Sequence, residues 1–152
     1  MKKSAGILPY RKSAGEVEVF LVHPGGPFWK NKDEHAWSVA KGELSDDEVP
    51  FNAALREFNE ETGFMASGNF LELAPVKQPG GKLVFVWAVE ADYDPASIRS
   101  NTFSLQWPPR SGKLIDVPEI DKAAWFPLSI ARQKIHKGQL PVLLQLISLT
   151  AG

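Results

Sequence analysis

The alternation of apolar and polar residues predicts the β-strands of this chain. In residues 16–23, Val17, Val19 and Leu21 alternate with Glu16, Glu18 and Phe20. The segment is therefore apolar on one face at its start and on both faces near its end. Residues 4–11 are also rich in β-branched and aromatic side chains, and the Lys-Ser-Ala-Gly turn at 12–15 predicts that the two segments pair. Later strands are predicted at residues 36–40, 70–77, 82–90 and 123–126.

Glycine and proline mark the predicted turns and loops. Pro79-Gly80-Gly81 predicts a hairpin between the strands at 70–77 and 82–90. Residues 24–35 begin with Pro-Gly-Gly-Pro, and residues 98–112 are interrupted by Pro108 and Pro109. The first segment is therefore predicted to be a loop, and the second an excursion from the domain or a long loop.

Helical spacing of apolar residues is clearest at residues 50–62. Pro50 suits the first helical position and Gly63 suits the C-terminal cap. Phe51, Ala54 and Phe58 share the side that we expect to pack on the sheet. Two further helices are predicted at residues 128–135 and 141–149. With no repeat or linker, the pattern predicts one mixed α/β domain over residues 1–152.

Composition and charge exclude several classes of function. The chain has 17 basic and 18 acidic residues and a net charge of -1, so it lacks the basic field that binds duplex nucleic acid. It has no cysteine, which excludes disulfides, thiolate metal sites and a cysteine nucleophile. No apolar run is long enough for a membrane span, and the start of the chain does not resemble a signal peptide. We expect a cytoplasmic protein, monomeric or homodimeric.

Three glutamates share one face of the predicted helix. Glu57 lies three and four residues before Glu60 and Glu61, so the three carboxylates form one stripe. Like charges at these spacings cost about 0.2–0.5 kcal/mol per pair, and a divalent cation would offset that cost. Magnesium prefers such oxygen ligands together with water and substrate phosphates. Glu48 is a candidate ligand or a residue that orients one, and Gly42 leaves room for a metal or phosphate.

Arg56 distinguishes this segment from an ordinary solvated helix face. It adjoins Glu57 in sequence but points elsewhere on the helix, so we expect its fork of donors to hold a carboxylate in place. An isolated Glu-x-x-Glu-Glu is usually a surface feature. Here seven residue identities recur at fixed spacings, which favours a functional site.

Residues 42–64 resemble a complete Nudix box, G-x5-E-x7-R-E-U-x-E-E-x-G-U, where U is apolar and is filled by Phe58 and Phe64. The resemblance implies an α/β/α sandwich with a mixed β-sheet and hydrolysis of a nucleoside diphosphate linked to another group, with Mg²⁺ or Mn²⁺. It implies Glu60 and Glu61 as metal ligands and Glu57 as a ligand or the residue that activates water. The backbone carbonyl of Lys41 or Gly42 is a further possible ligand.

Residues outside the box supply weaker candidates. The family often takes another glutamate from a later loop, and Glu119 is the candidate here, against a reading as a surface residue. Phe28 and Trp29 lie in the glycine-rich loop, where they either stack on a base or close a small hydrophobic cluster. Lys41, which abuts the box, is a candidate for contact with phosphate. The three histidines are scattered and are interpreted as structural.

The substrate is less well determined than the reaction. The run from Trp37 to Glu43 is similar to one found among dinucleoside-polyphosphate and diphosphoinositol branches, and it favours a dinucleoside polyphosphate. Pro79 lies where ADP-ribose-cleaving relatives tend to have a proline, but the hairpin turn explains it. ADP-ribose, nucleotide-sugar or nucleoside triphosphate cleavage is the alternative. A nucleotide-binding sensor without activity is a rival of another class, and the absent cysteine argues against a prenyl-diphosphate isomerase.

Overall fold

The computed structural model describes residues 2–150 and contains a mixed sheet built around one long strand, β1 (Lys3–Ser13). β1 pairs antiparallel with β2 (Glu16–Pro24) through a turn at Ala14 and Gly15, both of which have positive φ. It also pairs parallel with β6 (Leu83–Glu90) and antiparallel with the short β3 (Ala40–Glu43). The predicted strand pair and its turn are confirmed.

Three further strands complete the seven-stranded sheet found in the described residues. β9 (Ile120–Pro127) pairs with β2, and both β4 (Phe70–Glu72) and β5 (Val76–Lys77) pair with β6. The order is β4-β6-β1-β2-β9, with β3 attached to β1 and β5 attached to β6. Within residues 2–150, β3 pairs with no strand other than β1, so its other edge carries no described strand.

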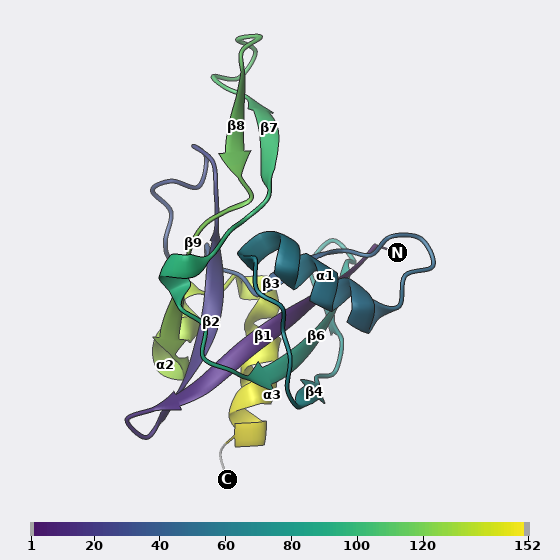
Figure 1. Ribbon diagram of the computed structural model, residues 1–152, viewed down its shortest axis with the longest axis vertical. Helices are drawn as coiled ribbons and strands as arrows, with labels where there is room; N and C mark the ends of the chain where they lie inside the picture. Colours follow the sequence, from purple (N-terminus) through teal and green to yellow (C-terminus); the bar gives the residue numbers. More distant parts are fainter. Residues whose placement is uncertain (1, 151–152) are drawn as a thin grey trace.

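Helices cover both faces of the sheet (Figure 1). On one face, α1 (Pro50–Thr62) packs through Ala54 and Phe58 against Ile7 and Phe20. The other face is covered by α2 (Leu128–Lys134), the short helix η2 (Lys137–Gln139) and α3 (Leu140–Thr150). These layers give the α/β/α arrangement that the resemblance implied. Within residues 2–150, no helix has the length and apolarity required to cross a bilayer.

Two predicted strands differ from those in the structure. Residues 36–40 do not form a continuous strand, because the backbone of Trp37 is hydrogen-bonded to Lys134 and His136 and makes an isolated bridge with Ile135. The strand β3 begins at Ala40. Residues 70–77 divide into β4 and β5, with Pro75, which lacks a backbone N–H, between them. At this break, the N–H of Ala74 donates to the side chain of Gln145.

The segment predicted as a long loop at residues 98–112 contains a strand. It follows the short helix η1 (Pro95–Ser97), and β7 (Thr102–Gln106) pairs with β8 (Leu114–Pro118) in a hairpin that projects from the body (Figure 1). The two prolines interrupt only the tip, while cross-strand pairs such as Leu105 with Ile115 stabilise the stem. The segment is therefore the excursion that the sequence offered as one alternative, and the other alternative, a long loop, was wrong for residues 102–106.

Candidate active site

Arg56 organises the carboxylates of the box. Its Nε and Nη2 donate to both oxygens of Glu48 at 2.8 and 2.9 Å. Its Nη1 donates to Glu57 at 2.9 Å and to both oxygens of Glu60 at 3.2 Å. The side-chain hydrogen bonds from Arg56, with that from the Ser45 backbone, lower the pKa of Glu48 to about 2. Arg56 thus joins the helix to the loop before it, and Glu48 has both oxygens engaged.

Glu61 is the most deeply placed carboxylate of the stripe, with 8% of its surface exposed. Its pKa is raised to about 8, first by burial and then by the charges of Glu57 and Glu119. The positive charge of Lys41 and then a hydrogen bond from its backbone act in the opposite direction. The pKa of Glu57 is also raised, first by burial. The site therefore holds more negative charge than its surroundings compensate.

Gly42 is required by a close approach between β3 and α1. A Cβ at this position would lie 2.0 Å from Oε2 of Glu57. Any other residue would push the carboxylate aside, so the glycine allows Glu57 to lie directly against the strand. The space that the sequence assigned to a metal or phosphate is occupied here by the Glu57 carboxylate itself.

Glu119 reaches the acidic stripe from the other end of the chain. Its N–H donates to the carbonyl of Asn101 at 2.8 Å, and its carbonyl accepts from the N–H of Gly25 at 2.9 Å. Asn101 in turn donates to the carbonyl of Glu60, which ties this segment to the end of α1. Burial raises the pKa of Glu119, followed by the charge of Glu60. The structure therefore places Glu119 beside the box glutamates.

The donors fit a hard divalent cation in kind. Glu57, Glu60, Glu61 and Glu119 offer only carboxylate oxygens. The pKa values of Glu57, Glu61 and Glu119 are raised, as expected for carboxylates that share a cation when the cation is not bound. In the described part of the chain, no three such side chains are already arranged around one point. The hydrogen bonds from Arg56 to Glu57 and Glu60 hold those two carboxylates toward the guanidinium.

The aromatic pair of the glycine-rich loop lies apart from this stripe. Phe28 is 59% exposed and meets Trp29 edge to face, with ring centroids 5.1 Å apart. The Nζ of Lys32 lies 3.8 Å from the Phe28 ring centroid. Among the contacts described for residues 2–150, none joins Phe28 or Trp29 to the acidic residues. Their role in binding a base stays a prediction.

Lys41 does adjoin the acidic residues. Burial lowers its pKa and so does the charge of Lys82, while Glu61 and other acidic groups act in the opposite direction. Its side chain lies on the opposite face of β3 from Gly42, because successive residues of a strand alternate. Sequence reasoning did not identify Lys82, whose position becomes visible only once the register of β6 is known.

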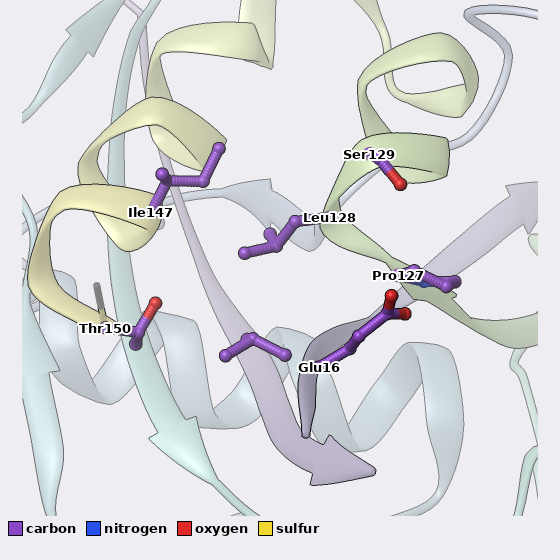
Figure 2. Close-up of a pocket in the computed structure, with 7 residues that line it drawn as sticks. Glu16, Pro127, Leu128, Ser129, Ile147 and Thr150 are labelled. Atoms are coloured by element: carbon purple, nitrogen blue, oxygen red, sulfur yellow. The ribbon is translucent and has the colours of Figure 1, made fainter. Parts of the chain in front are cut away.

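Buried His23 fits the structural role expected for the histidines. Its Nδ1 lies 2.9 Å from Asp121 and its Nε2 lies 2.6 Å from the carbonyl of Lys32, so it fastens the loop to β9. The pocket in Figure 2 lies elsewhere, between the start of β2 and the helices α2 and α3. Glu16 is the one carboxylate in its described lining, and none of the box glutamates borders it.

Comparison with known proteins agrees with this geometry. The chain is 37% identical over 59 residues to an asymmetrical bis(5'-nucleosyl)-tetraphosphatase of Caenorhabditis elegans, a match that spans 39% of this chain and 38% of that protein. The fold resembles a C. elegans Ap4A hydrolase in a binary complex, with a TM-score of 0.65, 20% identity and coverage of 100% and 99% of the two chains.

A second solved structure is similar over most of its length. It is the NUDIX domain of Shewanella oneidensis NrtR complexed with ADP ribose, with a TM-score of 0.66, 14% identity and coverage of 97% of this chain and 86% of that one. At these identities the structures show a shared fold. A family model described as NUDIX domain matches residues 2–146. The chain therefore belongs to the Nudix family.

Proposed function

We propose that the protein is a divalent-metal-dependent pyrophosphohydrolase that cleaves a nucleoside diphosphate linked to another group. The observation that carries this proposal is the acidic cluster of Glu57, Glu60, Glu61 and Glu119, gathered around α1 with too little positive charge to balance it. Every fixed position of the Nudix box is filled. Cytoplasmic location and a monomeric or homodimeric state stay predictions.

Each residue of the cluster has a separate part in this proposal. Glu57, Glu60 and Glu61 would hold Mg²⁺ or Mn²⁺, and Glu119 is a further ligand or the base that takes a proton from the attacking water. A bound divalent ion supplies charge neutralisation on the diphosphate and acidifies water. Arg56 and Glu48 keep the carboxylates oriented, through the fork of hydrogen bonds between them. Lys41 binds substrate phosphate.

Dinucleoside polyphosphates are the substrate class that we favour. The matched segment of the C. elegans tetraphosphatase supports it, as does the run from Trp37 to Glu43. The alternative is ADP-ribose or a nucleotide sugar, a class supported by the similarity to an NrtR domain complexed with ADP ribose. Nucleoside triphosphates complete the alternatives. A sensor that binds nucleotide without cleaving it is the rival of another class.

The test is turnover of a substrate panel in Mg²⁺ or Mn²⁺, with products identified by mass spectrometry. The panel contains dinucleoside tri- and tetraphosphates, ADP-ribose, nucleotide sugars and nucleoside triphosphates. Glu60→Gln removes one charge and keeps shape, so we expect a loss of about 100-fold or more in kcat/KM. Glu72→Gln makes the same change at an exposed position of β4 and should keep full activity. Binding without phosphate release would identify a sensor instead.

A further inference from the structure

The pairing of β2 with β9 is irregular near the acidic residues. Residues 23 and 24 of β2 pair with Lys122 and Ile120, so Asp121 is an extra residue on β9. An extra residue on one of two paired strands is a β-bulge, which changes the direction in which the neighbouring side chains point. Asp121 follows Glu119 by two residues in the sequence, so the bulge lies directly beside a candidate site residue.

The bulge turns two consecutive side chains of β9 to the same face of the sheet. Ile120 and Ala123 both pack in the core cluster under α1. In a regular strand, residues three apart point to opposite faces, so Asp121 and Lys122 both point away from α1. The Nζ of Lys122 accordingly lies 5.6 Å from the ring centroid of Trp37, a residue of the core cluster on the other face.

His23 holds the side chain of Asp121 in this direction. The His23 ring has no exposed surface and meets the Trp37 ring with centroids 5.2 Å apart. Its Nε2 lies 2.6 Å from the carbonyl oxygen of Lys32, and Nε2 is the donor because a carbonyl oxygen only accepts. Its Nδ1 is hydrogen-bonded to the Asp121 carboxylate at 2.9 Å. Both ring nitrogens are engaged, so a ring that cannot turn fixes the extra residue of β9.

The backbone of Glu119 lies between β2 and the segment bonded to α1. Its carbonyl accepts from the N–H of Gly25, two residues after His23, and its N–H is linked through Asn101 to the end of α1. A Cβ on Gly25 would lie 2.0 Å from the carbonyl oxygen of Pro118, so the chain after β2 stays in direct contact with the backbone before Glu119. The bulge therefore determines which residue of the chain occupies the place beside α1.

Loss of the bulge would move Glu119 out of that place. The pairing of β2 with β9 is regular from Glu18 to His23, so the strands cannot adjust on that side of the bulge. If Asp121 instead paired opposite residue 24, each preceding residue would shift by one and exchange faces. In the present register the charge of Glu60 acts on Glu119 and, after burial, raises its pKa, which places the two carboxylates close together.

We propose that Asp121 is a positioning residue for Glu119: its hydrogen bond with His23 maintains the bulge and thereby keeps the Glu119 carboxylate beside the box glutamates. The inference rests on the proposed function, in which Glu119 is a metal ligand or the base. Because its own side chain points away from α1, Asp121 acts through the backbone. Its effect on the metal site therefore depends on the presence of the Glu119 carboxylate.

A double-mutant cycle on Mn²⁺ affinity tests this dependence. Free Mn²⁺ is measured by electron paramagnetic resonance in titrations without substrate. Glu119→Gln and Asp121→Ala should each weaken Mn²⁺ binding about tenfold, the first by removing the charge and the second by displacing it. In the double variant the loss should equal that of Glu119→Gln alone. Losses that multiply, or an unchanged affinity in either single variant, would overturn the proposal.

Asp121→Asn separates the contact from the charge. The amide group of an asparagine donates to Nδ1 of a neutral imidazole, so the pair with His23 survives although a negative charge is lost. This variant should bind Mn²⁺ within about twofold of the wild type and keep its melting temperature. A loss equal to that of Asp121→Ala would show an effect of charge and contradict the proposal. Asp116→Ala removes a carboxylate that Ser104 bonds on exposed β8 and should bind Mn²⁺ like the wild type.

Kinetics distinguish this inference from the proposed function. With a dinucleoside tetraphosphate and saturating Mg²⁺, Asp121→Ala should lower kcat about tenfold with KM within about twofold, because the change displaces a group of the metal site. An unchanged kcat in Asp121→Ala, beside an active wild type, removes the positioning role and leaves the proposed function. A wild type that cleaves nothing while the Mn²⁺ losses fail to multiply removes the function and leaves the positioning role.

Discussion

The two faces of β3 differ in how their charged side chains are compensated. On the α1 face, Arg56 donates to three glutamates, Glu48, Glu57 and Glu60, from the same helix or the loop before it. On the α3 face, the ammonium group of Lys41 has no ion pair within the described residues, and the Ser4 hydroxyl beside it is unpaired. On the α1 face the hydrogen bonds from Arg56 fix the carboxylates before any ligand binds, whereas on the α3 face Lys41 and Ser4 have no such partners within the described residues.

The difference suggests that the two faces have different tasks. Carboxylates that share a cation must keep their geometry against mutual repulsion, and the planar fork of an arginine fixes such geometry well. Changes that remove a partner on one face, or supply one on the other, test this contrast.

The largest expected effect concerns the buried carboxyl group of Glu61, whose pKa is raised first by burial and then by the charges of Glu57 and Glu119. Because its pKa in the folded protein is about 8, above the ordinary 4.5, the folded state binds the proton more tightly than the unfolded state. The corresponding stability is complete below about pH 4.5 and is lost as the pH rises through about 8, by at most roughly 5 kcal/mol. Urea unfolding in EDTA from pH 5 to 9 should show the decline, and saturating Mg²⁺ should reduce it.

Glu61→Gln removes the ionising group and serves as the comparison. This variant should be more stable than the wild type at pH 9 in EDTA and should show a much flatter profile. Glu72→Gln at the exposed position of β4 should keep the wild-type profile. A wild-type stability that does not change between pH 5 and 9 would contradict the excess of negative charge in this site.

Arg56→Ala is expected to have the next largest effect, on activity. The change frees Glu48, Glu57 and Glu60 together, so we expect kcat/KM to fall about 100-fold, which corresponds to roughly 2.7 kcal/mol of transition-state stabilisation. Arg56→Lys keeps the charge but loses the planar fork of donors, so its kcat/KM should lie between those of the wild type and Arg56→Ala. Arg11, which pairs with Glu18 and Asp92 on the sheet, gives the matched control. Equal kcat/KM in Arg11→Ala and Arg56→Ala would refute the organising role.

The sequence predicted the α1 face well because its information is local. Pro50, Gly63 and the spacing of Glu57, Glu60 and Glu61 all lie within one helix, where neighbours three or four residues apart must meet. The helix bounds in the structure agree with the prediction. The fork from Arg56 to Glu48 was expected in kind, although its partner was left open.

The α3 face was not predictable from local patterns. Ser4, Lys41 and Lys82 come together only through the register of β1 with β3 and β6, and a shift of one residue would turn each side chain to the other face. The same limit explains the missed strand at residues 102–106, which is stabilised by its pairing with β8 rather than by its own composition. Glu119 was found from the resemblance, and its hydrogen bonds with Asn101 and Gly25 are again non-local.

The smallest effect is expected from Gln139, which fastens η2 to the α3 face. Its buried Oε1 accepts from the N–H of Val39 at 2.9 Å, and its Nε2 donates to Ser38 at 3.0 Å. Gln139→Met keeps the volume but leaves a buried N–H unpaired, so we expect a loss of about 1–2 kcal/mol in the free energy of unfolding. Gln145→Met breaks a similar amide pair with Ala74 at a partly exposed position, and should cost less. Equal free energies of unfolding in Gln139→Met and Gln145→Met, measured by urea denaturation, would contradict this role of Gln139.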